Sequence, residues 1–245
     1  KFQHNAPPRF VRALGTFEQY YDKGHEEGGC GAPVNSLHIV SKEETTKEII
    51  ADALVKLQQM TPNLRWCIHE DMYTSEAVSA RAFFDMEEPR IDLEVVPSED
   101  WISIMESEAV TKFDTKKGPL WRVKYMPNVK LGRAESNFPH EFVIILTFHH
   151  SIVDGMSYQR LFGYFLDFLS DVNHGKPKDV ITELPVMPPL DHFLRQYMGQ
   201  TAFDRLLKGA IRLVSRFPWL ANKLVEKVIY SKSLFLDVFP PEALK

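Results

Sequence analysis

The sequence has 245 residues, of which 44% are hydrophobic, 25% are charged and 12% are aromatic. These proportions are typical of a globular protein with a sizeable core, and they exclude a disordered or fibrous chain. The formal net charge of −4 argues against a general nucleic-acid binder, which would need a dominant basic surface.

The sequence gives no sign of membrane insertion or secretion. No apolar run approaches the roughly 20 residues needed to span a bilayer, and no segment has the pattern of a signal peptide. Cys30 and Cys67 are the two cysteines, and their spacing fits neither a disulfide framework nor a zinc site. We therefore expect a soluble, cytoplasmic protein, although two cysteines do not exclude secretion.

Hydrophobic patterns predict alternating strands and helices before residue 149. Ser41 and Glu44 have the capping-box spacing ahead of an apolar helical stripe, which predicts a helix over residues 41–60. A second helix is predicted to begin near Ser98. The expected strands are residues 34–40, 64–69, 80–86, 90–96, 120–126 and 142–148.

The last of these strands leads into an unusual loop. Residues 142–148 are apolar on both faces, as in a strand at the middle of a covered sheet. Beyond Gly155, residues 158–172 carry a helical apolar stripe, with Ser157 as the expected N-cap. The stretch EFVIILTFHHSIVDGMSY (141–158) therefore predicts a strand, a tight loop and a helix.

The C-terminal region is expected to be a linker followed by helix. The Pro-containing residues 176–191 predict the linker, and Pro218 is expected to interrupt the helical region after it. Three cations at helical spacing are Lys208, Arg212 and Arg216. A solvated face explains them; a membrane-surface helix and a contact to coenzyme A phosphates are the alternatives.

Two adjacent histidines, His149 and His150, lie on the loop together with Asp154. A side chain on a loop after a buried strand is held rigidly yet can be reached from a cleft, and histidine suits proton transfer near neutral pH. Adjacent residues on an extended chain point to opposite sides, so we expect no shared metal ion. We interpret most other histidines as solvated surface residues, for example His4, His25 and His174.

The segment HHSIVDG (149–155) resembles the HHxxxDG motif of an acyltransferase superfamily. This superfamily includes nonribosomal peptide condensation domains, alcohol and wax-ester acyltransferases, BAHD acyltransferases and chloramphenicol acetyltransferase. Segments LGTFEQYY (14–21), PNLRWCI (62–68) and FDTKKGPLWRV (113–123) agree with it. The resemblance, over about residues 10–175, implies an α/β fold like chloramphenicol acetyltransferase. This is a two-layer sandwich with a mixed sheet covered by helices, as the N-terminal half of a two-half pseudodimer.

The resemblance also implies a mechanism. His150 would act as general base on an acceptor hydroxyl or amine, which attacks a thioester carbonyl. Acyl-CoA is the expected co-substrate and a carrier-protein thioester the other possibility. No permanently bound cofactor, metal or acyl-enzyme is implied.

Other residues of the motif would support His150. Asp154, the second residue assigned to catalysis, would brace the loop by pairing with an arginine. Arg65 is the first candidate for that arginine and Arg122 the second. His149 would be a structural neighbour, and Gly155 would leave room for the substrate.

Members of the superfamily are built from two halves, and segments typical of the second half are not found in this sequence. We expect residues 1–175 to form the first half, 176–191 a linker and 192–245 the helical start of the second half. A truncated chain, a remainder outside the sequence and a precursor cleaved into two chains are the three explanations. The missing initiator methionine favours cleavage, which makes a second polypeptide an expected partner beside the acyl donor and acceptor.

Two other functions stay open. A lipid- or pigment-binding protein could reuse the acyltransferase tunnel without turnover, since a fold and motif can outlive an activity. A metal-dependent hydrolase would require bound metal. Copurification of a coloured or lipidic ligand without thioester consumption would favour the binding protein.

Overall fold

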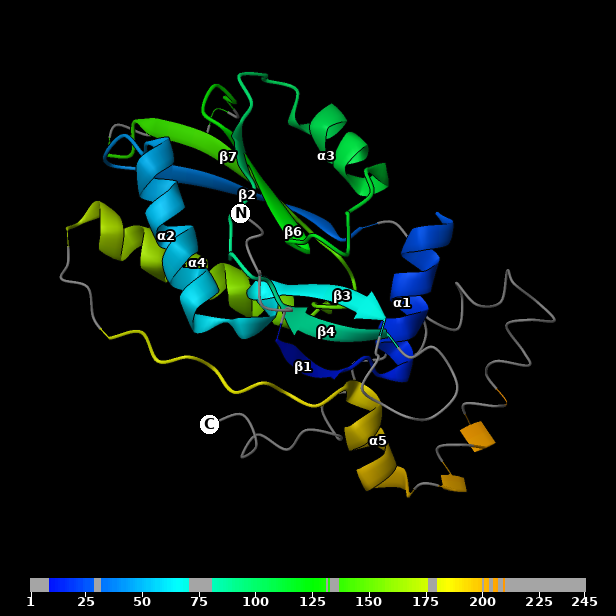
Figure 1. The fold of residues 1–245 in the computed structure, drawn as a ribbon. Coiled ribbons are helices and arrows are strands. Elements are labelled where there is room, and N and C mark those ends of the chain that lie inside the picture. Colours follow the sequence, from blue (N-terminus) through cyan, green and yellow to red (C-terminus); the bar gives the residue numbers. More distant parts are fainter. Residues whose placement is uncertain are drawn as a thin grey trace, which may run out of the picture. The chain divides into compact units, whose positions relative to one another are not determined.

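The computed structural model describes residues 9–28, 32–70, 81–130, 132, 137–175, 180–199, 201–202, 205–206 and 209 (Figure 1). The chain divides into two compact units, Lys1–Met187 and Pro188–Lys245. The expected helix break at Pro218 and the cation face of Lys208, Arg212 and Arg216 lie outside the described residues.

The first unit alternates strands and helices. In chain order its elements are β1 (Phe10–Ala13), α1 (Thr16–Glu27), β2 (Val34–Ser41), α2 (Lys47–Met60), the 3₁₀ turn η1 (Pro62–Arg65), β3 (Trp66–Glu70), β4 (Arg81–Asp85), β5 (Leu93–Val95), α3 (Trp101–Val110), β6 (Trp121–Met126), β7 (His140–Phe148) and α4 (Ser157–Asn173). The second unit contains α5 (Leu190–Met198). The six predicted strands and the helices after Ser98 and Gly155 are all present.

Two sheets form the first unit. The larger has the strand order β2-β7-β6-β5, in which β7 is antiparallel to β2 and β6 while β5 is parallel to β6. The smaller is antiparallel, with the order β1-β4-β3. The predicted mixed sheet covered by helices is confirmed, and the separate small sheet is an addition to it.

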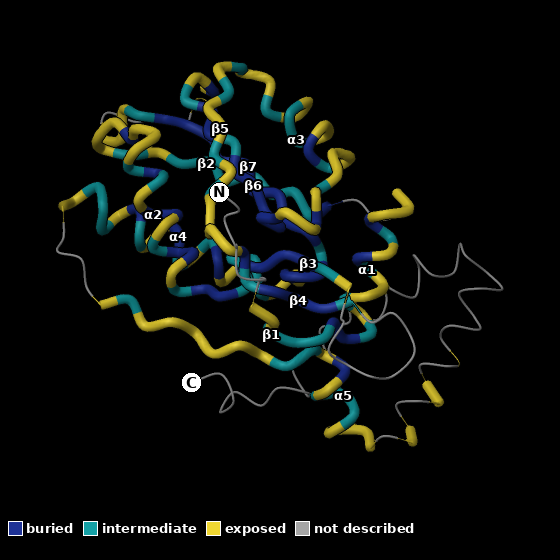
Figure 2. Tube along the Cα trace, viewed as in Figure 1, coloured by how far each residue is buried: buried dark blue, intermediate teal, exposed yellow. Residues whose placement is uncertain are grey.

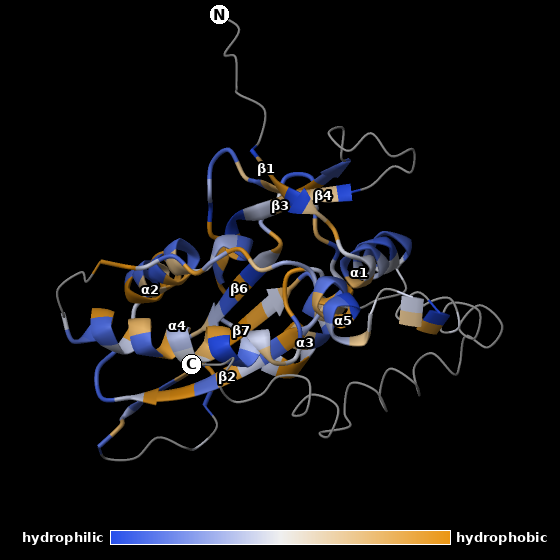
Figure 3. Ribbon diagram, turned by 90° about the horizontal axis from the view of Figure 1, so that it is seen from below, coloured by the Kyte–Doolittle hydropathy of each residue, from blue (hydrophilic) through white to orange (hydrophobic). Residues whose placement is uncertain are grey.

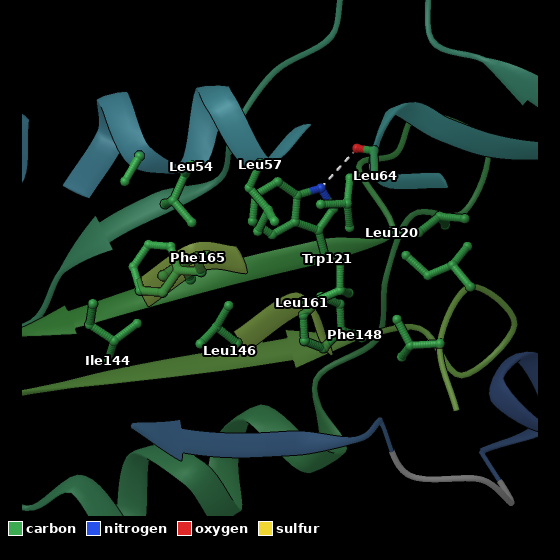
Figure 4. Close-up of a cluster of buried hydrophobic side chains, with 14 of the residues drawn as sticks. Leu54, Leu57, Leu64, Leu120, Trp121, Ile144, Leu146, Phe148, Leu161 and Phe165 are labelled. Carbon is green, nitrogen blue, oxygen red and sulfur yellow. Dashed lines mark hydrogen bonds between the residues drawn. The ribbon is translucent and has the colours of Figure 1, made fainter. Parts of the chain in front are cut away.

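Strand β7 separates two apolar layers, because its side chains alternate between the faces of the sheet. Ile144, Leu146 and Phe148 belong to one buried cluster with residues of α2 and α4, whereas Val143 and Ile145 pack with residues of α3. Figure 4 shows the first cluster, and Figures 2 and 3 show how buried and hydrophobic β7 is. The strand that precedes the two histidines is therefore fixed from both sides.

Trp121 anchors the same cluster. Its side chain is fully buried, and its indole Nε1–H donates to the carbonyl oxygen of Leu64 at 2.9 Å, as drawn in Figure 4. A buried indole needs such a partner, because an unpaired polar group in the core is costly. The bond ties β6 to η1, the turn next to the histidine loop.

Helix α2 begins later than the capping-box spacing predicted. Ser41 is the last residue of β2, where it pairs with His140 of β7, and its hydroxyl donates to the Glu43 carbonyl at 2.6 Å. The N-cap is Thr46, whose hydroxyl accepts from the Ile49 N–H at 3.4 Å. Pairing in the sheet thus places Ser41 in β2, whereas the sequence pattern assigned it to the start of the helix.

Helix α1 was not predicted, because its buried side chains are polar. Asp22 and His25 are 1% and 7% exposed, so the helix lacks the apolar stripe by which helices are recognised. It begins at Gly15, whose N–H donates to the Glu18 carboxylate at 2.6 Å, and Arg12 holds that carboxylate at 2.6 and 2.7 Å.

The expected linker has no regular secondary structure over residues 180–189. Within the first unit, the Leu184 N–H donates to the Met60 carbonyl at 2.8 Å, at the end of α2. The domain limits at residues 175 and 191 stay predictions. Among the described residues, no helix has the length and apolar character required to cross a membrane.

Candidate active site

The two histidines follow directly on β7, in a loop that the backbone holds at three points. The Phe148 N–H donates to the Pro33 carbonyl at 3.0 Å, and the His149 N–H donates to the Leu120 carbonyl at 2.8 Å. Within the loop, the Ile152 N–H donates to the His149 carbonyl at 3.1 Å. The loop therefore has a defined conformation on a rigid mount.

His150 lies partly exposed on this loop, with one ring nitrogen assigned by its partner. Its Nδ1 lies 3.0 Å from the Val153 carbonyl oxygen. A carbonyl can only accept, so Nδ1 carries the proton and donates. In the neutral ring Nε2 then keeps its lone pair, which is the requirement for a general base.

The His150 ring is also stacked on Tyr21 of α1. The two ring centroids are 3.8 Å apart, and the planes are 9° from parallel. Nothing in the sequence pattern marked Tyr21 as part of the site, although it ends the LGTFEQYY segment on which the resemblance rested. The contact joins residues 129 positions apart (150 − 21).

His149 points into the protein and is fully buried. Its Nδ1 accepts from the Ser151 N–H at 3.3 Å and from the Ser151 hydroxyl at 2.7 Å, so the proton is on Nε2. Burial, with smaller effects of His25 and His150, lowers the pKa of His149 to about 3. His149 is therefore neutral near pH 7 and too weak a base to share the role assigned to His150.

A carboxylate faces His149 from α1. The Oδ1 atom of Asp22 lies 4.0 Å from His149 Nε2, and neither atom has a hydrogen-bond partner among the described residues. Burial raises the pKa of Asp22 to about 6, against the opposing effect of Arg81, whose Nε lies 2.8 Å from Asp22 Oδ2. At pH 7 Asp22 is thus the anionic partner of Arg81, beside a neutral His149.

His25 belongs to the same group, so its interpretation as a surface residue was wrong. Its ring lies 4.6 Å from that of His149, and its Nε2 accepts from the Phe113 N–H at 2.9 Å. Burial, followed by Lys112 and Arg122, lowers the pKa of His25. His174 is exposed as expected, and His4 lies outside the described residues.

Asp154 braces the loop through backbone N–H groups, and no arginine among the described residues pairs with it. Its Oδ1 accepts from the N–H groups of Met156 and Ser157 at 3.1 and 2.8 Å, and its own N–H donates to the Ser157 hydroxyl at 2.7 Å. These bonds cap the start of α4, so Asp154 takes the capping role that was expected of Ser157. A Cβ added to Gly155 would meet nothing within 4 Å among the described residues, so its role in substrate clearance stays a prediction.

Both arginines proposed as partners of Asp154 are engaged elsewhere. Arg65 donates to the carbonyls of Gln58 and Gln59 at 2.5 and 3.2 Å and pairs with Glu183 at 2.5 Å. Arg122 pairs with the buried Glu108 beneath the sheet and donates to its carbonyl at 3.0 Å. The predicted pairing was wrong, because nearer acceptors satisfy each guanidinium.

Asn63 supplies a brace that the sequence did not reveal. Its side-chain amide donates to the Ile152 carbonyl at 2.8 Å, joining η1 to the histidine loop. Asn63 lies inside the segment PNLRWCI, in which the resemblance points to Arg65. An amide that bonds a distant carbonyl leaves no periodic signal in the sequence.

Comparisons with known proteins bear on the fold. No family model matches the chain. Among curated proteins, cyclosporin synthetase from Tolypocladium inflatum is 28% identical over 144 residues, which are 57% of this chain and 1% of that protein.

Solved structures with similar folds include a condensation domain, an X-domain and a polyketide synthase associated protein. The first condensation domain of the CDA synthetase aligns with a TM-score of 0.57 and 15% identity over 84% of this chain and 49% of its own. The X-domain from teicoplanin biosynthesis aligns with a TM-score of 0.55 and 16% identity over 84% of this chain and 43% of its own. Polyketide synthase associated protein 5 from Mycobacterium tuberculosis aligns with a TM-score of 0.52 and 16% identity over 78% of this chain and 39% of its own. The chain spans less than half of each of these structures, and it shares their fold.

Proposed function

We propose that the chain carries the histidine side of an acyltransferase site, which moves an acyl group from a thioester to an alcohol or amine. One observation carries the proposal: the Val153 carbonyl holds His150 Nδ1 at 3.0 Å, which leaves Nε2 as the basic nitrogen of a partly exposed ring. The HHSIVDG motif and the condensation-domain fold support it. The donor, the acceptor and the role of each residue are part of the proposal.

The reaction follows from this tautomer. The acceptor O–H or N–H donates to His150 Nε2, and the proton moves to Nε2 as the acceptor atom attacks the thioester carbonyl carbon. The tetrahedral oxyanion then reforms the carbonyl and breaks the C–S bond, and Nε2–H returns the proton to the departing thiolate. General-base assistance of this kind is worth about 100- to 10,000-fold in rate.

In this proposal the neighbouring residues position His150 and do not exchange protons with substrate. Asp154 caps α4 with its carboxylate, and Asn63 holds the Ile152 carbonyl. His149 is buried, with its proton directed toward Asp22. The side of the site opposite His150 is proposed to come from residues beyond these 245, on the same or a second polypeptide, because the chain spans less than half of the structures it resembles.

The donor is tested directly. The polypeptide that contains these residues is incubated with acyl-CoA or with an acyl carrier-protein thioester, together with a panel of amines and alcohols. Released thiol and acylated acceptor are then measured in the same sample. We expect the two products in equal amounts with at least one donor class, and the class that reacts identifies the co-substrate.

A different result would contradict the proposal. If purified protein retains a lipid or pigment and releases no thiol from either donor class, the chain belongs to a binding protein. The comparison needs no variant, so it does not depend on the stability of a mutant.

A further inference from the structure

We propose that Tyr21 is a positioning residue for His150, a role that rests on the proposed function. The carrying observation is the parallel stack of the two rings, with centroids 3.8 Å apart and planes 9° from parallel. Tyr21 lies on α1, which the sequence did not predict, and neither the motif nor the mechanism above uses it.

The stack and the Val153 bond control different motions of the imidazole. The hydrogen bond from Nδ1 to the Val153 carbonyl sets which edge of the ring faces the loop backbone. This single hydrogen bond still permits the imidazole to rotate about the line from Nδ1 to the Val153 carbonyl oxygen. The face of the Tyr21 ring prevents that rotation, so the two contacts together fix the direction in which the Nε2 lone pair points.

Helix α1 is itself fixed, which makes Tyr21 a firm support. Asp22, the next residue, pairs with Arg81 of β4, and His25, one turn further, accepts from the Phe113 N–H. The Gly15–Glu18–Arg12 cap holds the start of the helix. The stacking ring thus rests on a helix that is tied at both ends.

The stack also suits the charge that His150 acquires in the reaction. When Nε2 takes the acceptor proton the imidazole becomes a cation, and the face of an aromatic ring attracts a cation. Ionisable groups on and near this loop have partners of their own: Asp22 pairs with Arg81, His25 accepts from the Phe113 N–H, the neutral His149 accepts from Ser151, and Asp154 accepts from the N–H groups of Met156 and Ser157. Tyr21 therefore favours the orientation of His150, and its ring face attracts the positive charge that develops on the imidazole during transfer.

The test compares Tyr21→Leu with Tyr21→Phe in the full polypeptide. Tyr21→Phe keeps the ring, so we expect wild-type kcat, whereas Tyr21→Leu should lower kcat by roughly 10- to 100-fold with little change in KM. Tyr20→Leu is the matched control, since Tyr20 lies on the same helix, is 53% exposed and lies edge-to-face with Tyr21, with ring centroids 5.6 Å apart. We expect it to keep wild-type kcat.

An NMR measurement separates this inference from the proposed function. The carbon-bound ring protons of His150 should be shifted upfield by the Tyr21 ring current in the wild type and in Tyr21→Phe, and should lose that shift in Tyr21→Leu. This readout does not require turnover.

If Tyr21→Leu keeps wild-type kcat while His150→Ala abolishes transfer, the positioning role is refuted and the function stands. Equal losses in Tyr20→Leu and Tyr21→Leu also refute it, because they indicate general loosening of α1. If His150→Ala has no effect, the function fails, whatever the NMR shows.

Discussion

The buried pair of Asp22 and His149 predicts a stability profile in which two acid-linked effects oppose each other. His149 has a pKa of about 3 in the fold and 6.5 as its ordinary value, so the unfolded chain binds more protons between these values. Stability from this group is lost as the pH falls through that window. Asp22 has a pKa of about 6 against an ordinary 3.8, so the folded chain binds more protons and gains stability over the same fall.

The magnitudes follow from about 1.4 kcal/mol per pKa unit. As the pH falls from 7 to 5, His149 lowers the free energy of unfolding by about 2 kcal/mol and Asp22 raises it by about 1 kcal/mol. The pair therefore lowers it by roughly 1 kcal/mol in total. Asp22→Asn removes the gain, so its free energy of unfolding should fall by about 2 kcal/mol over the same interval. His149→Gln removes the loss, so its free energy of unfolding should rise by about 1 kcal/mol.

Urea unfolding followed by tryptophan fluorescence at pH 7, 6 and 5 measures these slopes. His174→Gln, a substitution at an exposed histidine, is the control and should follow the wild type. If the free energies of unfolding of Asp22→Asn and His149→Gln change with pH in the same direction, the opposed effects of the two groups are disproved. If both variants run parallel to the wild type, neither group titrates differently in the fold.

Two further substitutions test the supports of the loop and sheet. Asn63→Leu leaves the Ile152 carbonyl without its donor, which should cost about 1–3 kcal/mol in urea unfolding and lower kcat more than it changes KM; an unchanged midpoint would contradict the brace. Arg122→Met removes the guanidinium from the buried Glu108, which keeps Lys124 at 3.5 Å and the Thr147 hydroxyl at 3.1 Å, and should cost about 3 kcal/mol in the same assay. Arg122→Met combined with Glu108→Leu should recover most of that loss, and failure to recover would show that the pair matters for packing and not for charge.

The strands and the histidine loop could be predicted because their signals are local. A short run of residues apolar on both faces located β7, and the change to a helical stripe beyond Gly155 located α4. The motif predicts His150 as the base without any information about its neighbours in the fold. The fold then followed from the resemblance, and the comparisons confirmed it.

The surroundings of His150 could not be predicted, because they depend on packing between distant segments. Tyr21 and Asn63 reach the loop from α1 and η1, and neither contact imposes a spacing on the sequence. The prediction that Asp154 pairs with an arginine was wrong for a different reason. The backbone N–H groups of the second and third residues after Asp154 donate to its carboxylate, and such a local turn competes with any distant partner.

The acyl-transfer rate of His150→Gln is the decisive measurement for the general base, since glutamine retains a polar side chain but cannot act as a base. With His174→Gln as the control, we expect kcat of His150→Gln to fall by about 100- to 10,000-fold at an unchanged unfolding midpoint. The control should keep the wild-type rate. Transfer by His150→Gln at the wild-type rate would contradict the assignment of His150 as general base.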